Sequence, residues 1–292
     1  MSPVSGDAEI RDVRYTRYAG ERRGRLAGVM SLARWGALRS LGARRGWKAK
    51  LIPIALAVLA LGPAIIVLGV RALFADQTGI DLTEALPFSG YQGIIGVLIL
   101  LFAAVTTPEL LCPDRRDGTL SLYFSTAVSR REYLAGRVLA AVVPLLLVTL
   151  VPLLVLYGGI LVFEEHPVAY LQDNWAQLPR ILAAGLLLAV YYGMVGLAVA
   201  SLTGRRAFAV GGYLLLLVAP TVLSGLLTEA FPDADAIRLI ELSVLPIVLA
   251  ASLFPDTGDI PNSTASLAAA YVLVVAAATA LLLWRYRRGA GE

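Results

Sequence analysis

Six stretches of about twenty mostly apolar residues constrain this chain more than any other feature of its sequence. A helix rises about 1.5 Å per residue, so it needs about 20 apolar residues to cross roughly 30 Å of hydrocarbon. The stretches cover residues 51–70, 91–111, 138–162, 181–202, 207–228 and 265–284. Hydrophobic residues make up 58% of the chain and charged residues only 16%, which excludes a disordered chain or a coiled coil. The sequence therefore predicts an all-α polytopic membrane protein with six transmembrane helices.

The distribution of basic residues predicts the orientation of these spans. Residues 1–50, the loop at 113–137, the turn at 205–206 and the tail after residue 284 carry 22 of the 25 Arg and Lys residues. The positive-inside rule then places both termini in the cytoplasm. A seventh apolar stretch at 242–254 is too short to span, and counting it would move the basic tail outside. It is therefore predicted as an outer re-entrant hairpin between spans five and six.

The predicted organisation follows from these spans. We expect a cytoplasmic tail at 1–25, an interfacial elbow helix at 26–50, a six-helix transmembrane domain at 51–284 and a second cytoplasmic tail at 285–292. No segment before residue 51 resembles a signal peptide, so we expect a cytoplasmic tail without a cleavable leader. The basic residues are interpreted as topology determinants that face anionic lipid, which argues against a nucleic-acid partner. The 23 Arg against two Lys indicate a GC-rich bacterial genome and hence a bacterial inner membrane.

The groups that enzymes and ion-coupled transporters need are missing from the spans. Up to residue 108 in span two, and throughout the other five, the spans contain no Asp, Glu, Lys, Arg or His. Coupling to a proton or ion usually requires such a group at membrane depth. One Cys and one His, His166 in an outer loop, cannot form a Cys- or His-rich metal centre, and the chain has no P-loop motif. We therefore expect no catalytic residue, no metal site and no ATPase in this chain.

The residues before the first span show a helical pattern. Leu26, Met30, Ala33, Ala37 and Leu41 recur at spacings of three and four, which predicts a helix with one apolar face. The surrounding arginines and tryptophans suit a helix at the level of the lipid headgroups. Two interpretations stay open: a basic retention segment without further role, and an elbow that also touches a cytoplasmic partner.

The loop between spans two and three is the most informative segment. Asp117 can cap a short helix in which Leu120, Tyr123 and Phe124 share one face. The sequence 129–132 matches the capping box S-x-x-E, which predicts that a helix starts there and runs into span three. A solvated loop has no use for an exposed apolar face, so this face is predicted to dock a partner. The alternative is that it lies on the membrane surface.

This loop resembles that of the ABC-2 permeases, the membrane subunits of type-2 ABC transporters. The resemblance rests on a glutamate near the end of span two, an acidic-basic cluster, Gly-Thr-Leu, a leucine-rich turn, Ser-Arg, and an aromatic residue before Gly-Arg. These are Glu109, Asp114, Arg115, Arg116, Asp117, Gly118, Thr119, Leu120, Leu122, Tyr123, Ser129, Arg130, Tyr133, Gly136 and Arg137. One departure is Ala127, where the family usually has proline. In outline the resemblance covers the whole chain.

The resemblance implies a coupling helix that contacts a separate ABC ATP-binding subunit, which binds the ATP and magnesium. The implied contact residues are Glu109, Asp114, Arg115, Arg116, Asp117, Gly118, Thr119, Leu120, Tyr123 and Phe124. Spans two and five would meet those of a second copy, or of a homologous permease, and form the pathway. Its candidate lining residues are Gln92, Thr106, Thr107, Tyr213, Thr221 and Ser224. Hydroxyls of this kind also bond commonly to their own helix.

The leading functional hypothesis is thus the permease subunit of an ATP-driven exporter. The alternative is a membrane anchor or scaffold that uses the same loop to dock a cytoplasmic protein without transport. An uncharged interior with scattered hydroxyls is compatible with an apolar or amphipathic cargo, while a peptide or a glycan stays open.

Overall fold

A computed structural model describes residues 24–43, 46–78, 87–125, 128–164, 166–231, 235–258 and 262–288. Within these ranges the regular elements are all helices. They are α1 (Arg25–Ser40), α2 (Trp47–Thr78), α4 (Phe88–Thr106), α5 (Pro108–Arg116), α6 (Leu120–Ser125), α7 (Arg130–Thr149), α8 (Val151–Phe163), α9 (Pro167–Asp173), α10 (Gln177–Ala200), α11 (Arg206–Ala230), the 3₁₀ helix η1 (Asp235–Ile240), α12 (Leu245–Ala251) and α13 (Thr264–Arg288).

The six predicted spans are confirmed as helices long and apolar enough to cross a membrane. They run over Ala49–Leu73, Phe88–Arg116, Arg130–Phe163, Gln177–Ala200, Arg206–Ala230 and Thr264–Arg287. The third begins eight residues before the predicted boundary because the helix already starts at the capping box. Arg137, which the prediction left outside the span, therefore lies two turns inside the helix.

Proline explains two interruptions within these spans. The second span is broken at Thr107, and α5 resumes at Pro108. The third is broken at Leu150, and Pro152 stands in the first turn of α8. Proline lacks the N–H that a continuous helix would need and fits the first turn of a new one. Each break lets the two halves of a span pack against different neighbours.

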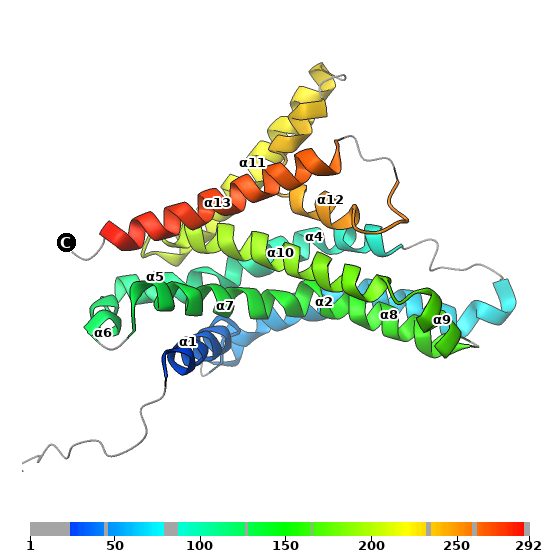
Figure 1. Ribbon diagram of the computed structural model, residues 1–292, viewed down its shortest axis with the longest axis horizontal. Helices are drawn as coiled ribbons and strands as arrows, with labels where there is room; N and C mark the ends of the chain where they lie inside the picture. The colour runs from blue at the N-terminus through cyan, green and yellow to red at the C-terminus, as the bar shows by residue number, and fades with distance from the viewer. Residues whose placement is uncertain are drawn as a thin grey trace, which may run out of the picture.

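The helices form an elongated bundle, and most of the long helices run along its long axis, as Figure 1 shows. α4, α7 and α10 run side by side through its middle, and α10 also packs on α11, α12 and α13. α2 packs on α4 and α8. α11 leaves the bundle obliquely, and its far end stands away from the other helices (Figure 1). One end of the bundle holds α6, the start of α11 and the end of α13, and we call it the α6 end.

The hairpin between α11 and α13, which is predicted to lie on the outer face and is called the outer hairpin below, contains η1 and α12. Its short helix α12 packs on α4, α10 and α13. The hydroxyls of Tyr191 and Tyr192 donate to the carbonyls of Leu242 and Ser243, at 2.9 and 2.6 Å. A Cβ on Gly96 would lie 2.6 Å from Cδ1 of Ile247, so α4 and α12 approach closely. The short helix is thus confirmed as an element too short to span, and its re-entrant position stays a prediction.

α1 is confirmed as a helix, and the side that it buries within the chain differs in part from the predicted apolar face. Leu26 is 82% exposed and Met30 is exposed too, whereas Ala33, Gly36 and Ser40 are buried. The reason is the partner helix: α1 packs on α7 through small residues, so the backbones come close. A Cβ on Gly36 would lie 2.7 Å from Cβ of Ala140. The headgroup-level position of α1 stays a prediction.

Candidate functional site

The predicted coupling loop folds as two short helices joined by a tight turn. α5 ends at Arg116, and Gly118 adopts a φ of +66°, a conformation that glycine reaches without steric cost. The backbone N–H and the hydroxyl of Thr119 both donate to the carbonyl of Asp114, at 3.1 and 3.3 Å. α6 then starts at Leu120. The Gly-Thr-Leu motif is therefore the turn that reverses the chain between α5 and α6.

The predicted role of Asp117 is wrong. Asp117 caps the C-terminus of α5 instead of starting α6, and its carboxylate accepts from Nε of Arg116 at 2.9 Å. The chain needs two further residues, Gly118 and Thr119, to complete the reversal before a new helix can begin. The carbonyl of Thr119 accepts the first N–H groups of α6, from Leu122 and Tyr123.

The capping box at the start of α7 is confirmed. The Ser129 hydroxyl accepts from the Glu132 N–H at 3.3 Å, and the Glu132 carboxylate accepts from the Ser129 N–H at 2.7 Å. Two otherwise unpaired N–H groups are thereby satisfied. This cap fixes the point at which the loop rejoins the bundle.

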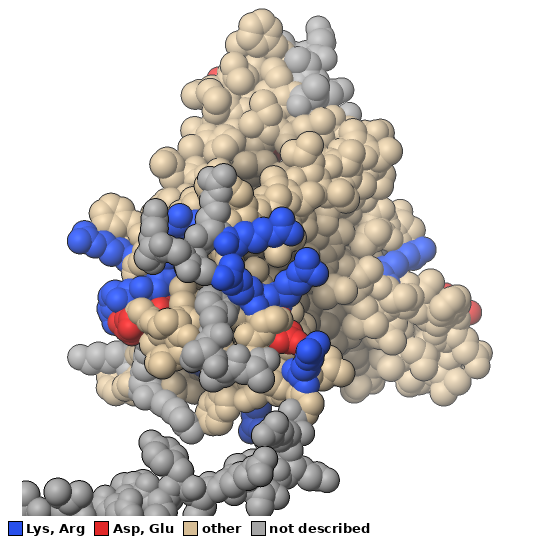
Figure 2. All heavy atoms as spheres, turned by 60° about the vertical axis from the view of Figure 1, so that its left-hand side comes forward, with Lys and Arg blue, Asp and Glu red and all other residues tan. Residues whose placement is uncertain are grey.

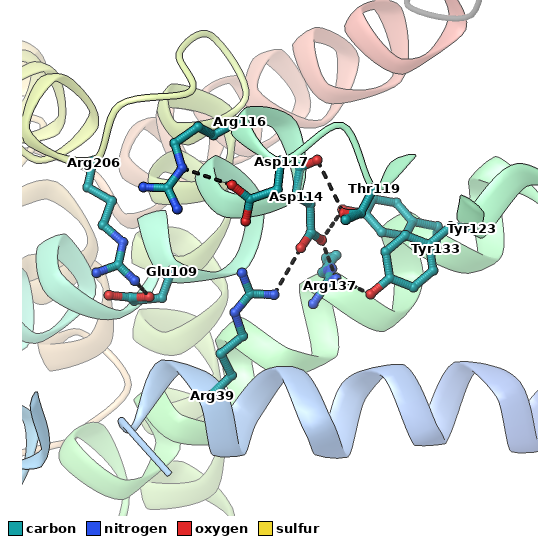
Figure 3. A network of polar contacts seen from close by, with 10 residues as sticks. All are labelled: Arg39, Glu109, Asp114, Arg116, Asp117, Thr119, Tyr123, Tyr133, Arg137 and Arg206. Carbon is teal, nitrogen blue, oxygen red and sulfur yellow. Dashed lines mark hydrogen bonds and ion pairs between the residues drawn. The ribbon is translucent and has the colours of Figure 1, made fainter. Parts of the chain in front are cut away.

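The carboxylate of Asp114 is the centre of the polar network in Figure 3. One oxygen accepts from Nη1 of Arg39 on α1 at 2.9 Å. The other accepts from the Tyr133 hydroxyl at 2.8 Å and from Nη2 of Arg137, both on α7. The side chains of Asp114 and Arg137 are each only 3% exposed. Charged hydrogen bonds shielded from water are the strong ones, so Asp114 ties α1, α5 and α7 together.

Two further contacts join α11 and α13 to the α6 end. Glu109 on α5 forms an ion pair with Arg206 at the start of α11 (Figure 3). Nη1 of Arg130 donates to the carbonyls of Tyr286 and Arg287 at 3.4 and 3.1 Å, in the last turn of α13. Cations at the C-terminus of a helix complement its unpaired carbonyls. α5 is therefore bound to α1, α7 and α11, and the start of α7 is bound to α13.

The apolar residues of α6 do not all face outward as predicted. Leu120 and Tyr123 are partly buried and pack on a cluster that includes Tyr133 and Tyr286. The Tyr123 and Tyr133 rings lie 5.4 Å apart, and the Arg137 guanidinium lies 5.7 Å from the Tyr123 ring. Aromatic and cation–π contacts of this kind keep this face of α6 packed against α7.

The apolar side chain that α6 exposes is instead Leu122, at 67%. Phe124 belongs to α6, but its side chain lies outside the described part of the structure. The partner contacts predicted for this loop stay predictions, and the exposed surface around them includes Arg116, Asp117, Gly118, Ser121 and Leu122. Arg115 is half-buried.

The side chains of the six candidate pathway residues are covered, fully or in part, by the chain itself. Gln92, Thr106, Thr107, Tyr213 and Ser224 are buried, and Thr221 is partly buried. The hydroxyls of Thr106 and Thr107 bond to carbonyls of their own helix. Thr221 bonds to Ser243, and Ser224 to Glu241, both in the outer hairpin. Their role in a pathway stays a prediction.

Two of these side chains lack hydrogen-bond partners. Both amide atoms of Gln92 and the hydroxyl of Tyr213 are buried and have no partner among the described residues. Unsatisfied polar groups are costly in an apolar setting.

The sequence prediction missed three residues that take part in the contacts at the α6 end. Arg39 and Arg206 were interpreted only as topology determinants, and Tyr286 was placed in a tail. A signal for Arg137 was present, since an arginine adjoining an apolar span and followed by 25 residues without charge needs a partner. Among the described residues no three His, Cys, Asp or Glu side chains gather as metal ligands would.

Comparison with known proteins gives the family. No curated protein matches the sequence. The family model described as ABC-2 family transporter protein matches residues 66–289, which covers five of the six spans, the loop with α5 and α6, and the outer hairpin. The match includes more than half of the chain, and it agrees with the resemblance found in the loop. The chain therefore belongs to the ABC-2 transporter family.

Proposed function

We propose that this chain is the permease subunit of an ATP-driven exporter and that α6 is the element through which a separate ATP-binding subunit moves it. The observation that carries the proposal is the attachment of α6. Leu120 and Tyr123 of α6 pack on the cluster with Tyr133 and Tyr286. The helices on either side of α6 are bound to the bundle, α5 through Asp114 and Glu109 to α1, α7 and α11, and α7 through Arg130 to α13. A force on α6 is thus passed to helices throughout the bundle.

In this proposal Leu122 is the apolar contact of α6 with the partner. It is the exposed leucine at the tip of the loop, whereas Leu120 and Tyr123 fill the chain's own cluster. Tyr123 and Leu120 then act by holding α6 in place. A variant at Leu122 therefore tests docking without disturbing the packing of α6.

The proposal includes a second copy, or a homologous permease, beside α4 and α11. Apolar side chains of these helices are uncovered within the chain: Ile94, Val97, Leu215, Val222 and Leu226 are all more than half exposed. The pathway would run between the copies, and a cargo touching such a surface is apolar or amphipathic. Both termini lie in the cytoplasm of a bacterial cell, with α1 at the headgroup level of the inner membrane.

The test is to co-express the chain with the ATP-binding protein of the neighbouring reading frame and to reconstitute the purified complex. We expect ATP hydrolysis only with both subunits, and transport that continues when the proton gradient is collapsed and stops when the ATPase is poisoned. Transport that follows the proton gradient without ATP would contradict the proposal. A stable complex that hydrolyses ATP but moves no cargo, over a screen of apolar and amphipathic compounds, would favour the scaffold.

A further inference from the structure

At the α6 end the described acidic side chains are paired within the chain, whereas several arginines are not. Its described acidic residues are Glu109, Asp114, Asp117 and Glu132, and every one has a partner within the chain. Glu109 pairs with Arg206, Asp114 with Arg39 and Arg137, and Asp117 with Arg116. The Glu132 carboxylate is taken up by the capping box and lies 3.9 Å from Arg25. No described carboxylate at this end is left for an outside partner.

The arginines at the same end are in excess. No described carboxylate lies within ion-pair distance of the guanidinium groups of Arg131, Arg205, Arg285 or Arg287. Arg131, Arg205 and Arg287 are exposed, and Arg285 is partly exposed. Figure 2 shows Lys and Arg gathered over this end, with only small acidic areas between them. We call these four residues the arginine collar.

The contacts of the loop bring the segments that carry the collar to the α6 end. Arg130 binds the last turn of α13, which carries Arg285 and Arg287, and Arg131 follows Arg130 in α7. Gly204, next to Arg205, lies beside Arg116 at the end of α5, with a distance of 3.8 Å from its Cβ position to the Arg116 nitrogen. The cations of α7, α11 and α13 thus come from three distant parts of the sequence to one face.

The positive-inside rule explains the excess of arginine but not this arrangement. Topology depends on how many cations flank the spans, whether or not nearby acids are neutralised. Pairing every described acid inside the chain leaves a surface of one sign, which attracts acidic partners and repels basic ones. Such a surface fits the rim of a protein interface, where charges steer association around an apolar centre.

The place of the collar favours a protein over lipid. α6 and the end of α13 lie at the extreme of the long axis, further out than α1 (Figure 1). α1 is the element proposed for the headgroup level, so α6 with its exposed Leu122 and the end of α13 with Arg285 and Arg287 stand beyond that level.

We infer that the arginine collar recognises a carboxylate-rich rim on the ATP-binding subunit, around the site that receives Leu122. The inference rests on the proposed function and adds to it the chemistry of the partner surface. The partner's acidic side chains form ion pairs with Arg131, Arg205, Arg285 and Arg287 and bring the subunit to α6 in one orientation.

The test is the association rate of the purified ATP-binding subunit with the full chain in nanodiscs of phosphatidylcholine alone. Between low and high salt we expect the wild-type rate to fall by about tenfold or more, since screening removes electrostatic steering. Arg131→Glu with Arg287→Glu should lower the low-salt rate to a similar extent and flatten the salt dependence. Arg131→Gln with Arg287→Gln, which adds no repulsion, should give a smaller loss in the same direction.

The matched control is Arg34→Glu with Lys50→Glu, which reverses two exposed cations outside the collar. It should leave the rate unchanged. If the wild type does not bind the ATP-binding subunit at all, the proposed function and the collar both fail. If the wild type binds and the collar variants bind equally fast, only the collar fails. Collar variants that bind normally but lose a preference for nanodiscs with phosphatidylglycerol would assign the arginines to anionic lipid and overturn the inference.

Discussion

The α6 end and the outer hairpin both join long helices of the bundle, yet they are held by different chemistry. At the α6 end the bonds are between charges: Asp114 binds two arginines, and Glu109 binds a third. At the hairpin the bonds to α10 are neutral, from the hydroxyls of Tyr191 and Tyr192 to backbone carbonyls. Its described bond to a charged group is that from the Ser224 hydroxyl to the Glu241 carboxylate, which forms no ion pair among the described residues.

This difference separates a rigid region from one that can rearrange. Breaking a buried ion pair leaves an uncompensated charge, which is strongly unfavourable. Exchanging one neutral hydrogen bond for another costs little, since each contributes about 1 kcal/mol net. We therefore expect the α6 end to move as one unit with α1 and α7, and the hairpin to change its contacts more easily. Variants in the two regions should differ accordingly.

The largest effect is expected from Asp114→Ala. It leaves Arg137 buried without its carboxylate, so the free energy of unfolding should fall by about 3–5 kcal/mol. Unfolding of the purified protein in mixed detergent measures this loss. Asp117→Ala is the matched control, because its ion pair with Arg116 is exposed, with side chains 50% and 71% accessible. That change should cost less than about 1 kcal/mol. Equal losses in the two variants would show that the Asp114 network does not hold the α6 end.

A smaller effect is expected where α1 packs on α7. Gly36→Ala places a methyl group 2.7 Å from Cβ of Ala140, so the helices must move apart. The cost should be about 1–3 kcal/mol, as for other overpacked sites. Gly28→Ala in the same helix meets nothing within 4 Å and should be neutral or stabilising by up to about 1 kcal/mol. Thermal unfolding compares the two, and a stable Gly36→Ala protein would argue against close packing of α1.

The smallest effect is expected at the hairpin. Tyr192→Phe removes the bond to the Ser243 carbonyl and should cost about 1 kcal/mol. Tyr213→Phe removes a buried hydroxyl that has no partner among the described residues, so it should be neutral or stabilising. Hydrogen exchange of the hairpin amides gives a local measurement. Faster exchange of the hairpin amides in Tyr213→Phe than in Tyr192→Phe would contradict the prediction that the Tyr192 hydroxyl stabilises the hairpin and the Tyr213 hydroxyl does not.

Sequence alone predicted the parts of this molecule that depend on local pattern. The six spans follow from runs of apolar residues, and the capping box from the spacing of Ser129 and Glu132. The start of α6 was misplaced because Asp117 is a good capping residue at either end of a turn, and only Gly118 decides which helix it serves.

The remaining features depend on contacts between distant segments. Arg39 and Asp114 are 75 residues apart, and nothing local indicates their pairing. The side of α1 that packs on α7 is set by small residues, and the apolar pattern of α1 does not indicate that side. Tyr123 faces inward because Tyr133 and Arg137 lie beneath it. The spacing of residues in a helix shows which of them share a face, but it does not show which part of the molecule that face contacts.

The most direct test of the docking role of α6 is a cysteine at its exposed tip. Leu122→Cys on a Cys112→Ser background should react rapidly with a membrane-impermeant maleimide in inside-out vesicles, because Leu122 is exposed and Cys112 is buried. Val168→Cys, exposed on α9, is the control and should react only when the opposite side is accessible. Adding the ATP-binding subunit should protect Leu122→Cys and leave Val168→Cys unchanged. Equal labelling of Leu122→Cys with and without the bound subunit would contradict docking at α6.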